Sequence, residues 1–240
     1  MKIALPQKIK FQKGKEDNQG EIIIEPCYPG YGITLGNAIR RVLLSSLPGA
    51  APVGVKIKGV NHEFMTQPHL KEDILEFILN LKLLRLKIFG NEPVKLELEV
   101  HGKKEIKASD IKKNSAVEII NNDLVLGSIT DMAGKLEAEI FVDNGMGYQT
   151  IESREGKSKE LGYIEMDSIF SPVISTGINI ENVRVGKMTN WEKLVLEIKT
   201  DGTMTPEEAF NASVDILVNQ FSALVPEKKE SKKDKKEEEK

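Results

Sequence analysis

Residues 34–49 read TLGNAIRRVLLSSLPG, and this stretch decides the first helix of the fold. Apolar side chains recur near a period of 3.6 residues, which predicts an amphipathic helix over 34–47. Thr34 stands where it could cap the helix, and Pro48 with Gly49 ends it. Leu44 widens the apolar face beyond the arc that one sheet covers. We therefore expect a second apolar contact for this helix.

Two changes of pattern divide the chain. The first twenty residues are polar and Lys-rich, and the first predicted strand follows at 21–25 (EIIIE). From Pro52 the chain changes to short strands and one helix within 71–84, including the alternating segment VKLELEV at 94–100. Longer strand patterns return after Gly162. The middle block is therefore predicted to be an α+β unit of its own.

The last predicted helix has the clearest start signal in the chain. Thr205 can cap it, Pro206 suits the first helical position, and Glu208 completes a capping box. Its apolar face is again wide, and Pro226 ends it. The tail 227–240, EKKESKKDKKEEEK, contains no apolar residue and is expected to be disordered.

Composition limits the possible functions. The net charge of −3 creates no cationic field for nucleic acid, so any DNA contact is expected to be indirect. Cys27 is the only cysteine, which excludes an internal disulfide and a multi-cysteine zinc site. No stretch approaches the roughly 20 apolar residues of a membrane span. We expect a cytoplasmic protein without a membrane partner.

No residue pattern in the sequence indicates a catalytic residue, a metal site or a bound cofactor. Glycines before the first helix suggest a phosphate loop, but they match neither GxGxxG nor GxxxxGK[ST]: Gly30, Gly32 and Gly36. A plain strand-to-helix turn is the simpler interpretation, and a nucleotide-binding enzyme is the weakest alternative. The three imidazoles lack HxxxH or HExxH spacing and are expected in exposed loops: His62, His69 and His101.

Arg40 and Arg41 are unusual because they stand in the middle of a very apolar helix. In one interpretation, their side chains extend from a buried helix to reach solvent. In the other, a planar guanidinium with several donors anchors a partner protein. The residues alone leave both interpretations open.

The run GYGITLGNAIRRVLLSSLPGAAPVGVKIKGVNHEF at 30–64, followed by EDILEFILNLKLL at 72–84, resembles the N-terminal region of bacterial RNA polymerase alpha subunits. The resemblance covers about 21–225 and includes SPV at 171–173. It implies an α+β fold in which a discontinuous dimerisation domain, an antiparallel sheet with two helices, holds an inserted α+β subdomain. The implied division is 1–48 and 169–226 for dimerisation, 49–168 for the insert and 227–240 for the disordered tail.

The resemblance also implies partners. Two copies would pair through the first and last helices, with these interface residues: Leu35, Ile39, Val42, Leu43, Phe210, Ile216, Leu217 and Phe221. The dimer would be a non-catalytic platform for the beta and beta-prime subunits of a DNA-directed RNA polymerase, a nucleotidyltransferase. Arg41 would contact beta, with Arg40 beside it, and further large-subunit contacts would map to Lys82, Ser171, Pro172 and Val173.

One departure and one alternative accompany this resemblance. Family members usually continue into a C-terminal domain that binds promoter DNA, whereas this sequence stops in the charged tail. We therefore expect contact with DNA only through the complex. The alternative from another class of protein is a free homodimeric interaction module, which would be recovered without polymerase subunits.

Overall fold

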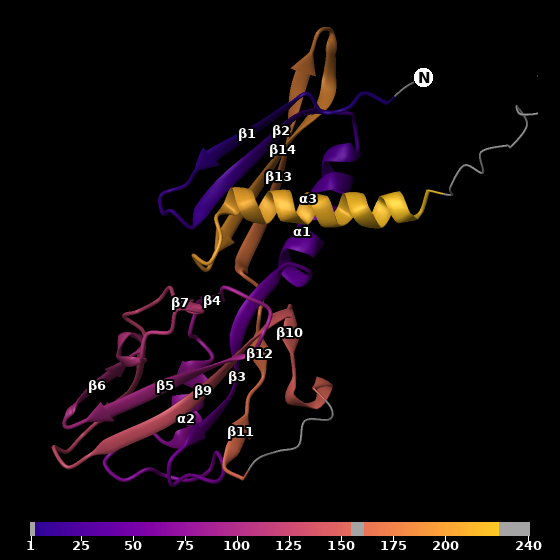
Figure 1. Ribbon diagram of the computed structural model, residues 1–240. Helices are drawn as coiled ribbons and strands as arrows, with labels where there is room; N and C mark the ends of the chain where they lie inside the picture. The colour runs from indigo at the N-terminus through magenta and orange to yellow at the C-terminus, as the bar shows by residue number, and fades with distance from the viewer. Residues whose placement is uncertain (1–2, 155–160, 226–240) are drawn as a thin grey trace, which may run out of the picture.

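A computed structural model describes residues 3–154 and 161–225 (Figure 1). The chain forms two units, each with its own antiparallel sheet and hydrophobic core. In Figure 1 the unit with α1 and α3 lies above the unit with α2, and the chain passes between them near the lower end of α1. The predicted α+β class, with antiparallel sheets, is confirmed. The predicted tail 227–240 lies outside the described residues.

The α1–α3 unit is built from both ends of the described chain. It contains β1 (Lys8–Lys13), β2 (Gln19–Cys27), α1 (Tyr31–Ser45), β13 (Val173–Val185), β14 (Met188–Thr200) and α3 (Pro206–Ala223). Its sheet has the order β1-β2-β14-β13. Ile24 lies opposite Leu194 and Ile22 opposite Leu196, and these buried side chains form a core with residues of α1 and α3. The core forms because apolar side chains alternate toward one face of β2 and β14.

The inserted unit comprises the intervening elements. They are β3 (Pro48–Ile57), α2 (Ile74–Leu81), β4 (Leu86–Ile88), β5 (Val94–His101), β6 (Lys104–Lys107), β7 (Val117–Ile119), β8 (Val125–Ile129), β9 (Lys135–Met146), β10 (Tyr148–Gln149), β11 (Tyr163–Glu165) and β12 (Ser168–Ile169). Single turns of 3-10 helix occupy Ala108–Asp110 and Ile151–Ser153. The main sheet has the order β5-β9-β3-β4-β7, with β11 also paired to β3.

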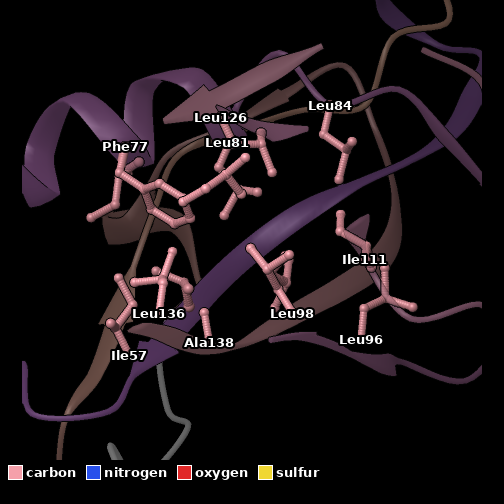
Figure 2. Packing of buried hydrophobic residues seen from close by; sticks show 14 of the residues in the cluster. Ile57, Phe77, Leu81, Leu84, Leu96, Leu98, Ile111, Leu126, Leu136 and Ala138 are labelled. Carbon is pink, nitrogen blue, oxygen red and sulfur yellow. The ribbon is translucent and has the colours of Figure 1, made fainter. Parts of the chain in front are cut away.

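The inserted unit has a core between α2 and the sheet. Figure 2 shows Phe77 and Leu81 of α2 lying over Leu136 and Ala138 of β9, and all four side chains are buried. Leu75 is exposed, whereas Phe77 is fully buried. The buried side chains follow a spacing of three and four residues that leaves Leu75 outside: Ile74, Phe77, Ile78 and Leu81.

The start of the first helix also differs from the prediction. α1 begins at Tyr31 rather than Thr34, and the Thr34 hydroxyl donates to the carbonyl oxygen of Gly30 at 3.1 Å. The carboxylate of Glu192 accepts the backbone N–H groups of Gly30 and Gly32 at 2.7 and 2.8 Å. A residue distant in the sequence therefore satisfies donors that a local cap would otherwise take.

The edge strand β1 had no predicted counterpart. All six of its side chains are exposed, so the strand has no buried apolar face to reveal it. Among the described strands it pairs with β2 alone, and the ring of Phe11 packs edge-on against Phe210 of α3 with centroids 5.8 Å apart. Edge strands commonly carry lysines, which limit unwanted strand pairing.

Candidate interaction surfaces

Arg40 and Arg41 lie on the exposed side of α1. The Ser45 hydroxyl donates to the backbone carbonyl oxygen of Arg41 at 2.7 Å, so this hydrogen bond does not involve the Arg41 guanidinium. Within residues 3–154 and 161–225, neither guanidinium forms an ion pair. Two adjacent positive charges are therefore available on the surface. Planar guanidinium groups bind carboxylates through two parallel hydrogen bonds.

The eight predicted interface residues fall into two groups. Ile39, Leu43 and Phe210 are buried within the core of a single chain, so their side chains support the helices from inside and do not lie on a surface. The other five are half-buried or exposed: Leu35, Val42, Ile216, Leu217 and Phe221. The reason is that α1 and α3 use different stripes of their wide apolar faces, one toward the sheet and one outward.

The C-terminal half of α3 exposes further apolar side chains that the sequence-based interface omitted. Beside Phe221, which is 60% exposed, these are Leu224, just beyond the helix and 76% exposed, and the exposed Val218 and Val225. In Figure 1, α3 crosses α1 and its C-terminal half extends past the sheet. Leu44 of α1 is exposed as well. Exposed apolar side chains that lie close together are typical of surfaces that contact another chain.

Lys82 follows the last residue of α2 and is held in place by the inserted unit. Its ammonium group lies 3.6 Å from Oδ2 of Asp167. The same Asp167 oxygen accepts the hydroxyl of Tyr148 at 3.0 Å, while Oδ1 accepts the backbone N–H of Ile151 at 2.9 Å. The Ile151 N–H, with smaller contributions from Tyr148 and Lys82, lowers the pKa of Asp167. Asp167 is therefore ionised and positions both Lys82 and Tyr148.

The segment predicted to contact a large subunit, Ser171 to Val173, is mostly covered by the chain itself. Pro172 and Val173 are buried, and the Pro172 carbonyl oxygen accepts the backbone N–H of Asp201 at 2.9 Å. Ser171 is half-buried, and its hydroxyl donates to the Val173 carbonyl oxygen at 3.3 Å. These apolar side chains are buried within the single chain, and contact between this segment and a large subunit stays a prediction.

A tight turn connects these features in space. Gly147 has a φ of 63°, and a Cβ there would lie 3.0 Å from the carbonyl oxygen of Ser45. Only glycine fits both the backbone conformation and this approach. The turn joins β9 to β10, so the end of α1 lies beside Tyr148, which contacts Asp167 and through it Lys82. Figure 1 shows β10 and β12 below α1. The end of α1 thus lies beside the turn that carries Tyr148.

The residues considered for chemistry are otherwise engaged or scattered. The N–H groups of Gly30 and Gly32 donate to Glu192, which opposes phosphate binding at this turn. Burial raises the pKa of the Cys27 thiol, which makes it a poor nucleophile. Within the described ranges no three His, Cys, Asp or Glu side chains converge on a possible metal position. No helix in the same ranges has the length and apolar character to cross a membrane.

Comparison with known proteins identifies the class and then the family. Residues 55–171 match the model of the RNA polymerase Rpb3/RpoA insert domain, which gives the class: an RNA polymerase subunit of the Rpb3/RpoA type. The DNA-directed RNA polymerase subunit alpha of Syntrophomonas wolfei is 45% identical over 93% of this chain and 75% of its own length. The subunit of the same name from Clostridium botulinum is 41% identical over 98% and 78%. That of Nitratidesulfovibrio vulgaris is 46% identical over 86% and 59%. The chain belongs to the family of DNA-directed RNA polymerase alpha subunits.

Proposed function

We propose that this chain is the homodimeric assembly platform of a DNA-directed RNA polymerase and has no active site of its own. Nucleotidyl transfer would take place on the beta and beta-prime subunits, which the dimer holds together, and DNA would be reached only through the complex. The apolar side chains exposed on α3, in a chain of the alpha-subunit family, carry this proposal.

The proposed dimer contact lies on α1 and α3. Val218, Phe221 and Leu224 are three residues apart, so they lie along one side of α3 and its extension. A two-fold dimer would use this same side on both copies, with Leu35 and Val42 of α1 beside it. Interfaces of obligate homodimers bury roughly 2,000 Å² or more and are apolar. Residues 1–48 and 169–226 would then form the dimerisation domain, and 49–168 the insert.

The proposed large-subunit contacts begin at Arg41. Its exposed guanidinium can bind a carboxylate of beta through paired hydrogen bonds, and Arg40 is the weaker candidate beside it. Lys82 supplies a further positive charge, and Ser171, Pro172 and Val173 are the remaining positions proposed to contact a large subunit. The family resemblance assigns these roles, and the exposure of both arginines supports them.

The test is to purify the tagged chain from its own cells at moderate salt and to record the native mass of what accompanies it. We expect two copies together with both large subunits. Arg41→Ala should abolish capture of beta and leave the dimer intact. Arg184→Ala is the matched control, because this exposed arginine lies near the β13–β14 turn and bonds only to its own hairpin among the described residues.

Two results would contradict the proposal. If Arg41→Ala captures beta at the wild-type level, the assignment of this residue is wrong. A bare dimer without polymerase subunits, recovered also when purified beta is added, would favour the free interaction module.

A further inference from the structure

The geometry points to Tyr148 as the central contact of a docking surface that also includes Ile169 and Lys82. Its occupant is a segment of a large polymerase subunit that presents a carboxylate between apolar side chains. This inference rests on the proposed assembly function and specifies the chemistry of the partner. No residue of β10 or β12 was among the contacts assigned from the sequence.

Exposed side chains on the paired strands β10 and β12 form the apolar part of this surface. Tyr148 of β10 lies directly opposite Ile169 of β12, so the two side chains are cross-strand neighbours. Tyr148 is 60% exposed, and both Ile169 and Ile151 are exposed beside it. Tyrosine is enriched at the centre of protein interfaces because its ring contributes much contact area at little cost in side-chain entropy.

Hydrogen bonds within the chain hold this surface together before any partner binds. The hydroxyl of Tyr148 donates a hydrogen bond to Asp167. The guanidinium of Arg154 holds β10 and β12 together through further hydrogen bonds. Arg154 donates to the carbonyl oxygens of Gln149 and Met166 at 3.2 and 2.9 Å, and to the Ser168 hydroxyl at 2.8 Å. A contact that is ordered in the free protein loses less entropy on binding.

One cation of this surface, Lys82, can bind a carboxylate of the partner. Lys82 lies 3.6 Å from Asp167, whose oxygens are already engaged by Tyr148 and Ile151, so Lys82 retains ammonium donors for a second carboxylate. Lys82 belongs to a chain whose net charge is −3, so its positive charge is a local feature. A carboxylate flanked by apolar groups complements both parts of the surface.

The position of the surface explains why it would serve the large subunits. The chain that leaves β12 enters the buried Pro172–Val173 segment, so the exposed Ile169 lies close to that segment in the chain. The Gly147 turn places Tyr148 between the end of α1 and Lys82. A two-fold dimer presents this surface twice, which provides one copy for each large subunit.

The experiment titrates the purified dimer with purified beta, followed by beta-prime, and measures affinity. Tyr148→Ala should weaken capture by about tenfold or more, because truncation of a central interface aromatic is costly. Tyr148→Phe keeps the ring and should weaken capture less. Met132→Ala is the control, since this 78% exposed apolar side chain lies at the β8–β9 turn. Native mass and thermal unfolding should be unchanged in all three variants.

Asp167 is a positioning residue and requires its own readout. Asp167→Ala should weaken capture more in the wild-type chain than in a chain already carrying Lys82→Ala, because part of its effect passes through Lys82. A purely structural role would weaken both equally. Wild-type capture should also fall with added salt, and Lys82→Ala should reduce that dependence.

The outcomes separate this inference from the proposed function. If Tyr148→Ala binds both large subunits as well as wild type while Arg41→Ala still loses beta, the docking surface is wrong and the assembly function stands. If the wild-type dimer binds neither large subunit, both proposals fail. Loss of affinity in Tyr148→Ala, with Met132→Ala unaffected, would support the docking surface.

Discussion

The carboxylate of Glu192 accepts the backbone N–H of Gly32 at 2.8 Å, which joins β14 to the first turn of α1. Its other oxygen accepts the Gly30 N–H at 2.7 Å. The negative carboxylate thus lies at the positive end of the helix dipole and takes two donors that have no partner within the helix. This contact connects residues 160 positions apart and orients the helix that carries Arg40 and Arg41.

Glu192→Ala should therefore destabilise the α1–α3 unit by about 1–2 kcal/mol, in the range found for loss of a helix cap. Urea unfolding would measure this change, with Glu207→Ala as the control, since Glu207 is exposed in the first turn of α3 without a capping contact. An unchanged unfolding midpoint for Glu192→Ala would contradict the capping role.

ATP at millimolar concentration should give no heat in calorimetry with the wild-type chain.

Phe221→Asp should convert the proposed dimer to monomers that remain folded. Phe221 is 60% exposed in the single chain, so the new carboxylate meets water in the monomer and would be buried only in the dimer. Light scattering would report the mass, and circular dichroism would report the fold. If the Phe221→Asp chain still forms dimers at the protein concentrations at which the wild-type chain does, Phe221 does not lie in the interface.

Leu43→Asp should have a different result from Phe221→Asp. Leu43 is fully buried in the core of one chain, so a carboxylate there would be desolvated without a partner. We expect loss of the folded chain rather than dissociation alone, and even Leu43→Ala should cost about 2–5 kcal/mol. Recovery of a stable, folded Leu43→Asp monomer would show that this side chain faces the partner instead.

The start of α3 should show a defined pH dependence. The Thr205 backbone N–H donates to the Glu208 carboxylate at 2.8 Å and, with the Thr205 hydroxyl, lowers the pKa of Glu208 below its ordinary 4.5. Because the folded-state pKa is the lower one, this stabilisation is present above about pH 4.5 and is lost as pH falls. Glu208→Gln should therefore reduce stability at pH 7 and have a smaller effect at pH 3 in urea unfolding. An equal effect at both pH values would contradict this mechanism.

The outer face of the inserted sheet should be sensitive to salt. Glu97 lies opposite Glu139 and Glu99 opposite Glu137, so lysines must offset like charges across β5 and β9. Lys112 lies 3.1 Å from Glu97 and 3.3 Å from Glu99. Lys112→Ala should lower the urea midpoint at low salt and have a smaller effect at 1 M salt, where the Debye length is about 3 Å. Lys113→Ala is the neighbouring control. A loss independent of salt would indicate a packing effect instead.

The strongest sequence predictions concerned elements with a clear period or clear end signals. α3 begins at Pro206 after a complete Thr205 capping box, as predicted, and VKLELEV forms most of β5. These succeed because local residues supply both the apolar pattern and the cap. β1 could not be found in this way, since an exposed edge strand lacks a buried face, and the Glu192 cap lies far from the helix it serves.

The sequence by itself determined the family, the α+β class and the presence of two helices with more apolar surface than one sheet can cover. Only the tertiary structure decided which of those side chains are internal. Leu43 and Phe221 are alike in pattern, yet one is in the core and the other in water, because the sheet lies beneath α1 while the end of α3 extends beyond it. Likewise, Pro172 and Val173 are buried while Tyr148 is exposed. Burial depends on contacts between distant segments, and a periodic pattern records only that a side chain is apolar.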